Sequence, residues 1–223
     1  EMERTLQVLD YAILVISGAD GIQGHTRTLW NLLDIYRVPV FIFVNKMDQP
    51  GTDRDRLMEE IRKQLGHGCV DFGRDRGRDF MEQVAMCDEV LLSEYIETGR
   101  IDDEHIRESI RDRRLFPCYF GAALRLEGVE ALMQGLAEYT IIPSWPDKFG
   151  ARVFKISRDE QGNRLSHLKI TGGVLRVRDV AGNGTWEEKV TQIRIYSGPK
   201  FETVNEAEAG TICAVTGLSQ TRP

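Results

Sequence analysis

Three polar residues follow directly on an apolar run, since Asn45, Lys46 and Asp48 come after Phe41–Val44. The run predicts a buried strand, and in an open α/β sheet ligands bind at the carboxyl ends of the strands. A carboxylate can accept two hydrogen bonds at once, which suits the N1–H and the N2 amine of guanine. Adenine lacks both donors and would leave the carboxylate unpaired, which is costly. The pattern N-K-x-D therefore predicts guanine recognition, in which Asp48 binds N1 and N2, Asn45 reaches N7, and the Lys46 stem lies across the ring.

A second strand end supports this interpretation, because Leu115–Phe120 is followed by Gly121, Ala122, Ala123 and Leu124. Small residues at a strand end expose backbone N–H groups. We expect those of Ala123 and Leu124 to donate to guanine O6, where adenine carries an amine. Two simpler explanations remain open at this point. The first motif can be a polar strand end that only caps the next helix, and Gly-Ala-Ala can reflect close helix packing.

Both motifs need a parallel sheet to bring them together, and the first 142 residues have the pattern of one. Tyr11–Ile16 is a continuous apolar run, which is typical of a strand buried on both faces. Such runs alternate with amphipathic stretches, which predicts parallel β-α units with right-handed crossovers. The loose stretch Gly66–Arg78 alternates Arg with Asp and is expected to be a solvated loop rather than a basic patch. Helical spacing of apolar residues predicts helices at about Gln23–Arg37, Leu57–Leu65, Phe80–Tyr95, Ile106–Ile110 and Val129–Leu136.

The pattern changes after Ile142–Asp147, where two prolines in four residues block both helix and sheet and indicate a linker. Short apolar segments then recur at close intervals, separated by glycine-containing turns. This pattern predicts a small antiparallel β-barrel. The expected strands are Val153–Ile156, Leu165–Ile170, Val174–Arg178, Val190–Ile195 and Thr211–Val215.

Composition describes an ordinary globular chain of 223 residues with a net charge of −6. Residues 147–223 hold 12 Lys/Arg and 9 Asp/Glu, a net of +3, and residues 1–146 hold 17 and 26, a net of −9. The positive second half permits a nucleic-acid contact. Four scattered cysteines with no C-x-x-C pair favour reduced thiols in the cytoplasm, and the dispersed histidines suggest no metal site. No apolar run approaches the ~20 residues that span a bilayer, so no membrane contact is expected.

With these motifs in place, the chain resembles the translational GTPases along essentially its whole length. Asn45-Lys46-Met47-Asp48 matches the guanine-specificity motif N-K-x-D of that family. Residues 121–124 stand where the family has G-S-A-x, although Ala122 replaces the usual serine and loses a hydroxyl contact. Residues 153–156, 175–179 and 210–218 resemble the family's second-domain barrel. Residues 1–6 resemble the helix after its D-x-P-G-H segment. Residues 153–156 and 165–179, with the moderate insert between Asp48 and Gly121, are most similar to the tetracycline-resistance ribosomal protection proteins.

The resemblance implies a fold, a ligand and a partner. The expected fold is α/β, a partial P-loop-type GTPase parallel sheet with helices, followed by a small antiparallel β-barrel. Residues 1–142 would be the C-terminal part of a GTPase domain, 143–147 a linker, and 148–223 the barrel. GTP or GDP is the implied ligand, held here by Asn45, Lys46, Asp48, Ala122, Ala123 and Leu124, and Mg²⁺ is expected only in the full-length protein. The implied partner is the ribosome, contacted as RNA and protein by the barrel and by further domains.

Two motifs of the family are absent from this sequence, the phosphate-binding G-x-x-x-x-G-K-[ST] and D-x-P-G-H. We therefore expect a fragment that contains no catalytic residue and does not hydrolyse GTP by itself, within a longer protein that releases tetracycline from the ribosome. Elongation factor G or a release-factor relative is one alternative, and a resistance assay would separate them. The other alternative is a non-catalytic module that binds RNA or protein, which a guanine-nucleotide titration would distinguish.

Overall fold

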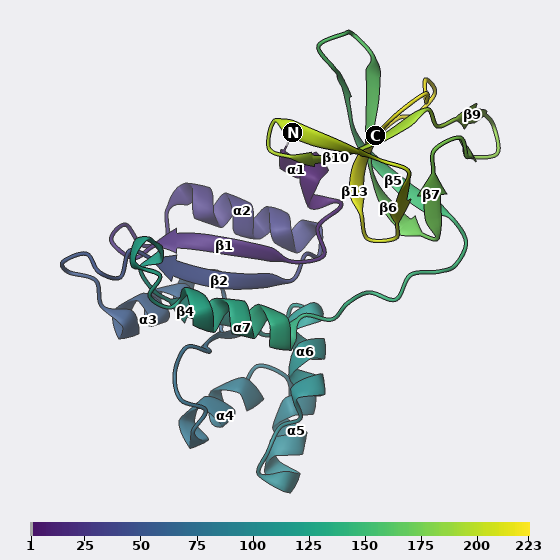
Figure 1. Cartoon of the computed structure of the whole chain (residues 1–223). Helices are drawn as coiled ribbons and strands as arrows, with labels where there is room; N and C mark the ends of the chain where they lie inside the picture. The colour runs from purple at the N-terminus through teal and green to yellow at the C-terminus, as the bar shows by residue number, and fades with distance from the viewer. Residues whose placement is uncertain (1) are drawn as a thin grey trace. The chain divides into compact units, whose positions relative to one another are not determined.

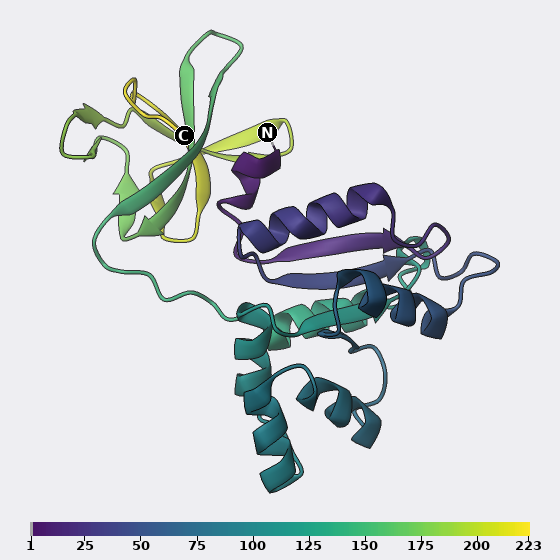
Figure 2. The same ribbon diagram turned by 180° about the vertical axis from the view of Figure 1, so that it is seen from behind.

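The computed structural model describes residues 2–223, except for the Met2 side chain, and its contacts divide the chain into two units (Figure 1). One unit is Leu9–Ile141. The other contains Ile142–Pro223 together with the first residues of the chain, up to Val8. The same division is visible from behind (Figure 2), where the segment after α7 leads from the α/β unit to the antiparallel strands.

The first unit is built on a four-stranded parallel sheet. Its strands are β1 (Ala12–Ser17), β2 (Val40–Asn45), β3 (Cys69–Asp71) and β4 (Phe116–Phe120), in the order β1-β2-β4-β3. The predicted parallel sheet is confirmed. Because β2 and β4 are neighbours, residues 45–48 after β2 and residues 121–124 after β4 lie at the same edge of the sheet.

Helices connect these strands: α2 (Gly24–Ile35), α3 (Arg54–Leu65), α4 (Arg78–Ala85), α5 (Glu89–Thr98), α6 (Asp103–Arg111), the short 3₁₀ helix η1 (Ala123–Arg125) and α7 (Val129–Tyr139). Helix α2 packs on β1 and α3 on β3, and α4, α5 and α6 form a helical group beyond the sheet (Figure 1). Apolar side chains of β2, β3 and β4 share one core with those of α4, α5, α6 and α7. Among the described residues, no helix is both long and apolar enough to cross a membrane.

The stretch expected to be a solvated loop contains the buried strand β3. Its last residue, Asp71, accepts two hydrogen bonds from Arg54, with Nε–Oδ2 and Nη2–Oδ1 distances of 2.7 Å, and lies 3.1 Å from Arg74 Nε. The pairing compensates for burial of the charge. The loop prediction was wrong here because three residues are too few to show a strand periodicity.

Two other expectations need correction. The helix expected over Phe80–Tyr95 is two helices, because Asp88 adopts an extended conformation and its side chain accepts from Val90 N to cap α5. Strand β1 is covered on one face only, since Leu14 and Ile16 are buried whereas Ile13 and Val15 are 45% and 58% exposed. An apolar run indicates a strand, but whether both faces of that strand are covered depends on the elements that pack around it.

The second unit is antiparallel, as predicted. Five strands form one sheet in the order β11-β10-β13-β6-β5. Two two-stranded ribbons, β12-β7 and β8-β9, share an apolar core with this sheet. Sequence periodicity missed β8, β9, β11 and β12, which are short or mostly exposed. The strands are β5 (Gly150–Arg158), β6 (Arg164–Gly172), β7 (Val174–Arg176), β8 (Val180–Gly182), β9 (Glu187–Lys189), β10 (Gln192–Ser197), β11 (Lys200–Val204), β12 (Glu206–Glu208) and β13 (Ile212–Thr216).

The N-terminal segment, which includes α1 (Met2–Leu6), belongs to this unit through specific contacts. The buried ammonium of Lys169 on β6 donates to Val8 O at 2.9 Å and lies 5.4 Å from the ring centre of Trp145. Arg152 Nη1 on β5 donates to Gln7 O at 3.0 Å. A buried lysine needs such partners because desolvation of its charge is unfavourable.

Candidate guanine-binding site

The structure brings together the ends of β2 and β4, which carry the two motifs. Val44 and Phe120 are paired in the β2–β4 register, and the chain beyond them stays connected by backbone hydrogen bonds. Gly121 N donates to Val44 O at 2.9 Å, and Met47 N donates to Gly121 O at 3.0 Å. The two loops therefore leave the sheet side by side, at the edge where ligands bind in parallel α/β sheets.

Asn45 is the side chain that joins the loops. Its Oδ1 accepts from Lys46 N at 2.8 Å and from Ala123 N at 2.9 Å. Lys46 has a φ of 63°, a left-handed conformation that is unfavourable for a non-glycine residue, and the bond to Asn45 helps to hold it. Because the oxygen is the accepting atom, the NH₂ group of this amide is the part that can donate to a ligand.

Asp48 lies at the mouth of the same loop and faces Arg125, which comes from η1. The distance from Arg125 Nε to Asp48 Oδ2 is 3.2 Å, and the two side chains are 61% and 24% exposed. A partly exposed carboxylate at this place is accessible to a ligand and keeps further acceptor positions, since a carboxylate has about four lone-pair sites.

Residues 122–124 differ in what they can offer a base. Ala122 is buried and paired with Glu127, with Ala122 N donating to Glu127 O at 3.0 Å and Glu127 N to Ala122 O at 3.2 Å. The Ala123 amide already donates to Asn45. The Leu124 side chain is 98% exposed at the mouth of the site. The structure thus gives Ala122 and Ala123 roles in shaping the loop, and direct contact of the Ala123 and Leu124 amides with O6 stays a prediction.

Three residues that the sequence did not single out support the first loop. Gly18 N donates to Asn45 O at 2.7 Å, and a Cβ at Gly18 would lie 2.9 Å from Met47 Sδ and 3.2 Å from Asn45 O, so a larger residue would require the Met47 side chain to shift. Thr52 Oγ1 lies 2.8 Å from Met47 O and from Gln49 O and donates to this part of the loop. Arg125 was also missed. Its only sequence signal is a basic residue directly after the second strand-end motif.

The side chains of Asn45, Lys46 and Asp48 suit a guanine base better than a metal ion or a reactive substrate. It provides a carboxylate, an amide and a lysine, which together can pair with the polar edge of the base and cover its face. Within residues 2–223, no three His, Cys, Asp or Glu side chains are grouped to hold a metal ion. All four cysteines are free thiols, and burial raises the pKa of Cys87 and of Cys213 to about 12, which makes these two thiols poor nucleophiles.

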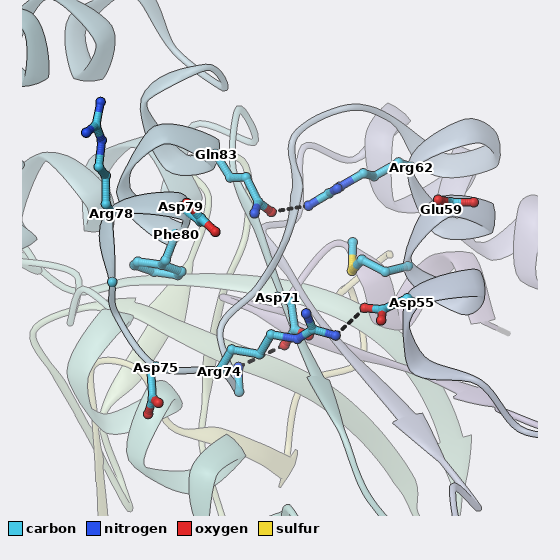
Figure 3. Close-up of a pocket in the computed structure, with 13 residues that line it drawn as sticks. Asp55, Glu59, Arg62, Asp71, Arg74, Asp75, Arg78, Asp79, Phe80 and Gln83 are labelled. Carbon is cyan, nitrogen blue, oxygen red and sulfur yellow. Dashed lines mark hydrogen bonds and ion pairs between the residues drawn. The ribbon is translucent and has the colours of Figure 1, made fainter.

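A concave region lies elsewhere in this unit, between α3, β3 and α4 (Figure 3). The pocket has a volume of about 840 Å³, and its lining is dominated by opposite charges that pair with one another. Arg74 bridges Asp55 and Asp71, and Arg62 donates to Gln83. The Arg74–Asp71 pair lies within the stretch 66–78 and agrees with the expectation that this stretch is not a basic patch. None of the residues that line this pocket belongs to the two loops that follow β2 and β4.

Comparison with protein families matches residues 1–141 to the elongation factor Tu GTP-binding domain and residues 148–222 to domain 2 of elongation factor G. The chain is 33% identical to tetracycline resistance protein TetP of Clostridium perfringens, over 98% of the chain and 38% of that protein. It is 30% identical to an oxytetracycline resistance protein of Streptomyces rimosus, over 100% of the chain and 39% of that protein. The chain therefore spans about two fifths of the length of the curated relatives it matches.

A crystal structure of a Thermus thermophilus protein matches 97% of this chain and 40% of its own length, with a TM-score of 0.79 and 22% identity. At this identity the match supports the fold alone. It agrees with an α/β unit followed by an antiparallel β unit.

Proposed function

The chain belongs to the translational GTPases, and on this premise we propose that it is the guanine-reading part of a ribosome-dependent GTPase. The observation that carries the proposal is the hydrogen bond from Ala123 N to Asn45 Oδ1 at 2.9 Å, which joins the two loops into one site. Asp48 then accepts from N1 and N2 of guanine, Asn45 donates to N7, and the Lys46 stem covers one face of the ring. The O6 atom accepts from the Leu124 amide, and it accepts from the Ala123 amide only where that N–H is shared with Asn45 Oδ1.

The longer protein around this chain is proposed to be a tetracycline-resistance ribosomal protection protein. Two of its relatives are named as tetracycline and oxytetracycline resistance proteins, which supports this choice over elongation factor G. Such a protein would work in the cytoplasm, where it would bind the ribosome, partly through residues 148–223, and release the drug. GTP and Mg²⁺ would supply the energy-yielding phosphoryl chemistry, which depends on positioning and on stabilisation of the γ-phosphate charge. The residues of this chain bind and orient the base.

Exchange of the base tests the assignment of Asp48. Asp48→Asn replaces an acceptor by an amide that can donate to the 2-oxo group of xanthine, so we expect binding of GMP to weaken and binding of XMP to strengthen. The monophosphates are suitable ligands because their binding depends mainly on the base. Titration of the ¹⁵N-labelled chain, followed by amide chemical shifts, measures both affinities. Unchanged GMP binding in this variant would refute the role of Asp48.

Two further measurements separate the alternatives. The chain by itself is expected not to turn over GTP, and steady hydrolysis by a preparation free of other GTPases would contradict that. Absence of any shift with GMP in the unmodified chain, while RNA binds, would favour the non-catalytic module. AMP serves as the matched control, since its base offers neither N1–H nor the N2 amine.

A further inference from the structure

Three contacts join the loops 45–48 and 121–125, which are called the base-reading loops here, and Arg125 makes the third. The first is Met47 N to Gly121 O at 3.0 Å, and the second is Ala123 N to Asn45 Oδ1 at 2.9 Å. Both of these fix the backbone where the loops leave the sheet. The third, Arg125 Nε to Asp48 Oδ2 at 3.2 Å, is the one that acts on the carboxylate proposed to read the base.

The chemistry of the pair allows Arg125 to remain while a base is bound. Guanine N1–H and N2–H take one lone pair on each carboxylate oxygen, and each oxygen keeps a second lone pair. The Arg125 guanidinium, whose Nε lies 3.2 Å from Oδ2 as an ion pair, can therefore share that oxygen with the base. A carboxylate held on one side has less rotational freedom to lose when the base binds.

No side chain at position 122 can take over this task. The family pattern G-S-A-x has a serine hydroxyl there, whereas Ala122 offers only a methyl group and is buried in its turn with Glu127. The side chain three residues further on, Arg125, reaches Asp48 instead. The two side chains come from loops 77 positions apart in the chain and meet only because β2 and β4 are neighbours.

We propose that Arg125 is a positioning residue for guanine recognition, which orients the Asp48 carboxylate so that it accepts from N1 and N2 together. The inference rests on the proposed function, because it assigns Asp48 to the base. Arg125 does not itself need to touch the base. Its effect is on selectivity for the 2-amino group, since two simultaneous hydrogen bonds demand a defined carboxylate orientation and a single bond does not.

The test compares GMP with IMP, whose base keeps N1–H and O6 and lacks the 2-amine. In Arg125→Ala we expect the GMP dissociation constant to rise about two- to fivefold, the range that corresponds to an exposed ion pair. The constant for IMP should rise less, so the preference for GMP over IMP falls. Arg125→Lys keeps the charge and should recover part of the preference. At about 1 M salt, where charges are screened within about 3 Å, the unmodified chain and the alanine variant should converge.

Arg78→Ala is the matched control, because Arg78 is an exposed arginine paired with an acidic residue, Glu82, and lies on α4 away from the site. Equal GMP and IMP changes in Arg125→Ala, or tighter GMP binding in that variant, would overturn the inference and leave the base site intact. Absence of all GMP binding in the unmodified chain would overturn the base site and the inference with it. The two failures are therefore distinguishable in one set of titrations.

Discussion

Replacement of Asn45 by alanine removes one acceptor atom that serves two backbone donors. The Asn45 Oδ1 atom accepts from Lys46 N at 2.8 Å and from Ala123 N at 2.9 Å. A hydrogen bond of this kind contributes about 1 kcal/mol net, and an unsatisfied buried donor costs about 1–3 kcal/mol. Lys46 N is near solvent and can bond water, so most of the loss falls on Ala123. We expect Asn45→Ala to destabilise the joined loops by about 1–3 kcal/mol.

Native-state hydrogen exchange measures this loss at the atom concerned. Because about 1.4 kcal/mol is a factor of ten, a loss of about 1–3 kcal/mol should lower the protection of the Ala123 amide about five- to 150-fold, whereas amides in the middle of β2 should change little. In Asn45→Ala the α/β unit would then open locally at the carboxyl ends of β2 and β4. Measurement at one amide is preferable to a whole-chain unfolding curve, since a chain with two units need not unfold in a single step.

Asn45→Asp is the matched variant that separates the two roles of this residue. Its carboxylate can still accept from Lys46 N and Ala123 N, so protection of the Ala123 amide should be kept or increased. It has no NH₂ group to donate to N7, so GMP binding should be lost in spite of intact loops. Equal loss of Ala123 protection in the alanine and aspartate variants would refute the reasoning, because the accepting oxygen would then not be the important atom.

Two further predictions follow from the geometry near the site and from one surface pair. A Cβ at Gly121 would overlap the carbonyl oxygen of Glu127. Gly121→Ala should therefore displace the second loop, abolish the chemical-shift changes on addition of GMP and lower the melting temperature. Gly24→Ala is the control, because a Cβ there, at the start of a helix, meets open space and should have none of these effects. The hydrogen bond that His105 Nδ1–H donates to the Glu94 carboxylate raises the pKa of His105 above its ordinary value of about 6.5, so the pair stabilises the fold fully below about pH 6.5. Its contribution disappears as pH rises through the raised pKa. An NMR titration of His105 should show the raised pKa, and Glu94→Gln should return it toward 6.5; an unchanged titration in that variant would contradict the assignment.

The local sequence was sufficient for the main elements of the first unit. Apolar runs located β1, β2 and β4, and helical spacing located α2, α3, α6 and α7, because these elements are long enough to show their periods. It was insufficient for β3, whose three residues have no readable period and are held by pairing with β4 and by the Arg54–Asp71 pair. The break between α4 and α5 was missed because it depends on the side chain of Asp88 capping a new helix.

In the second unit, too, the strands that the sequence did not predict are short or exposed. The strands β5, β6, β7, β10 and β13 were predicted, whereas β8, β9 and β12 have only three residues each and β11 is mostly exposed, so none of these four shows a readable period. The attachment of the first residues of the chain to this unit was equally hidden from the sequence. It rests on Lys169 and Arg152, whose acceptors are backbone carbonyls more than 140 positions away.

The sequence by itself was enough to predict the base, since the types and order of Asn45, Lys46 and Asp48 offer hydrogen-bond chemistry that guanine satisfies and adenine does not. Only the tertiary structure decided how those groups are held. The pairing of β2 with β4 places Asn45 against Ala123 and Arg125 against Asp48. Donor and acceptor types belong to individual residues and can be read locally. Their distances depend on which strands become neighbours, and that is a property of the whole packed sheet.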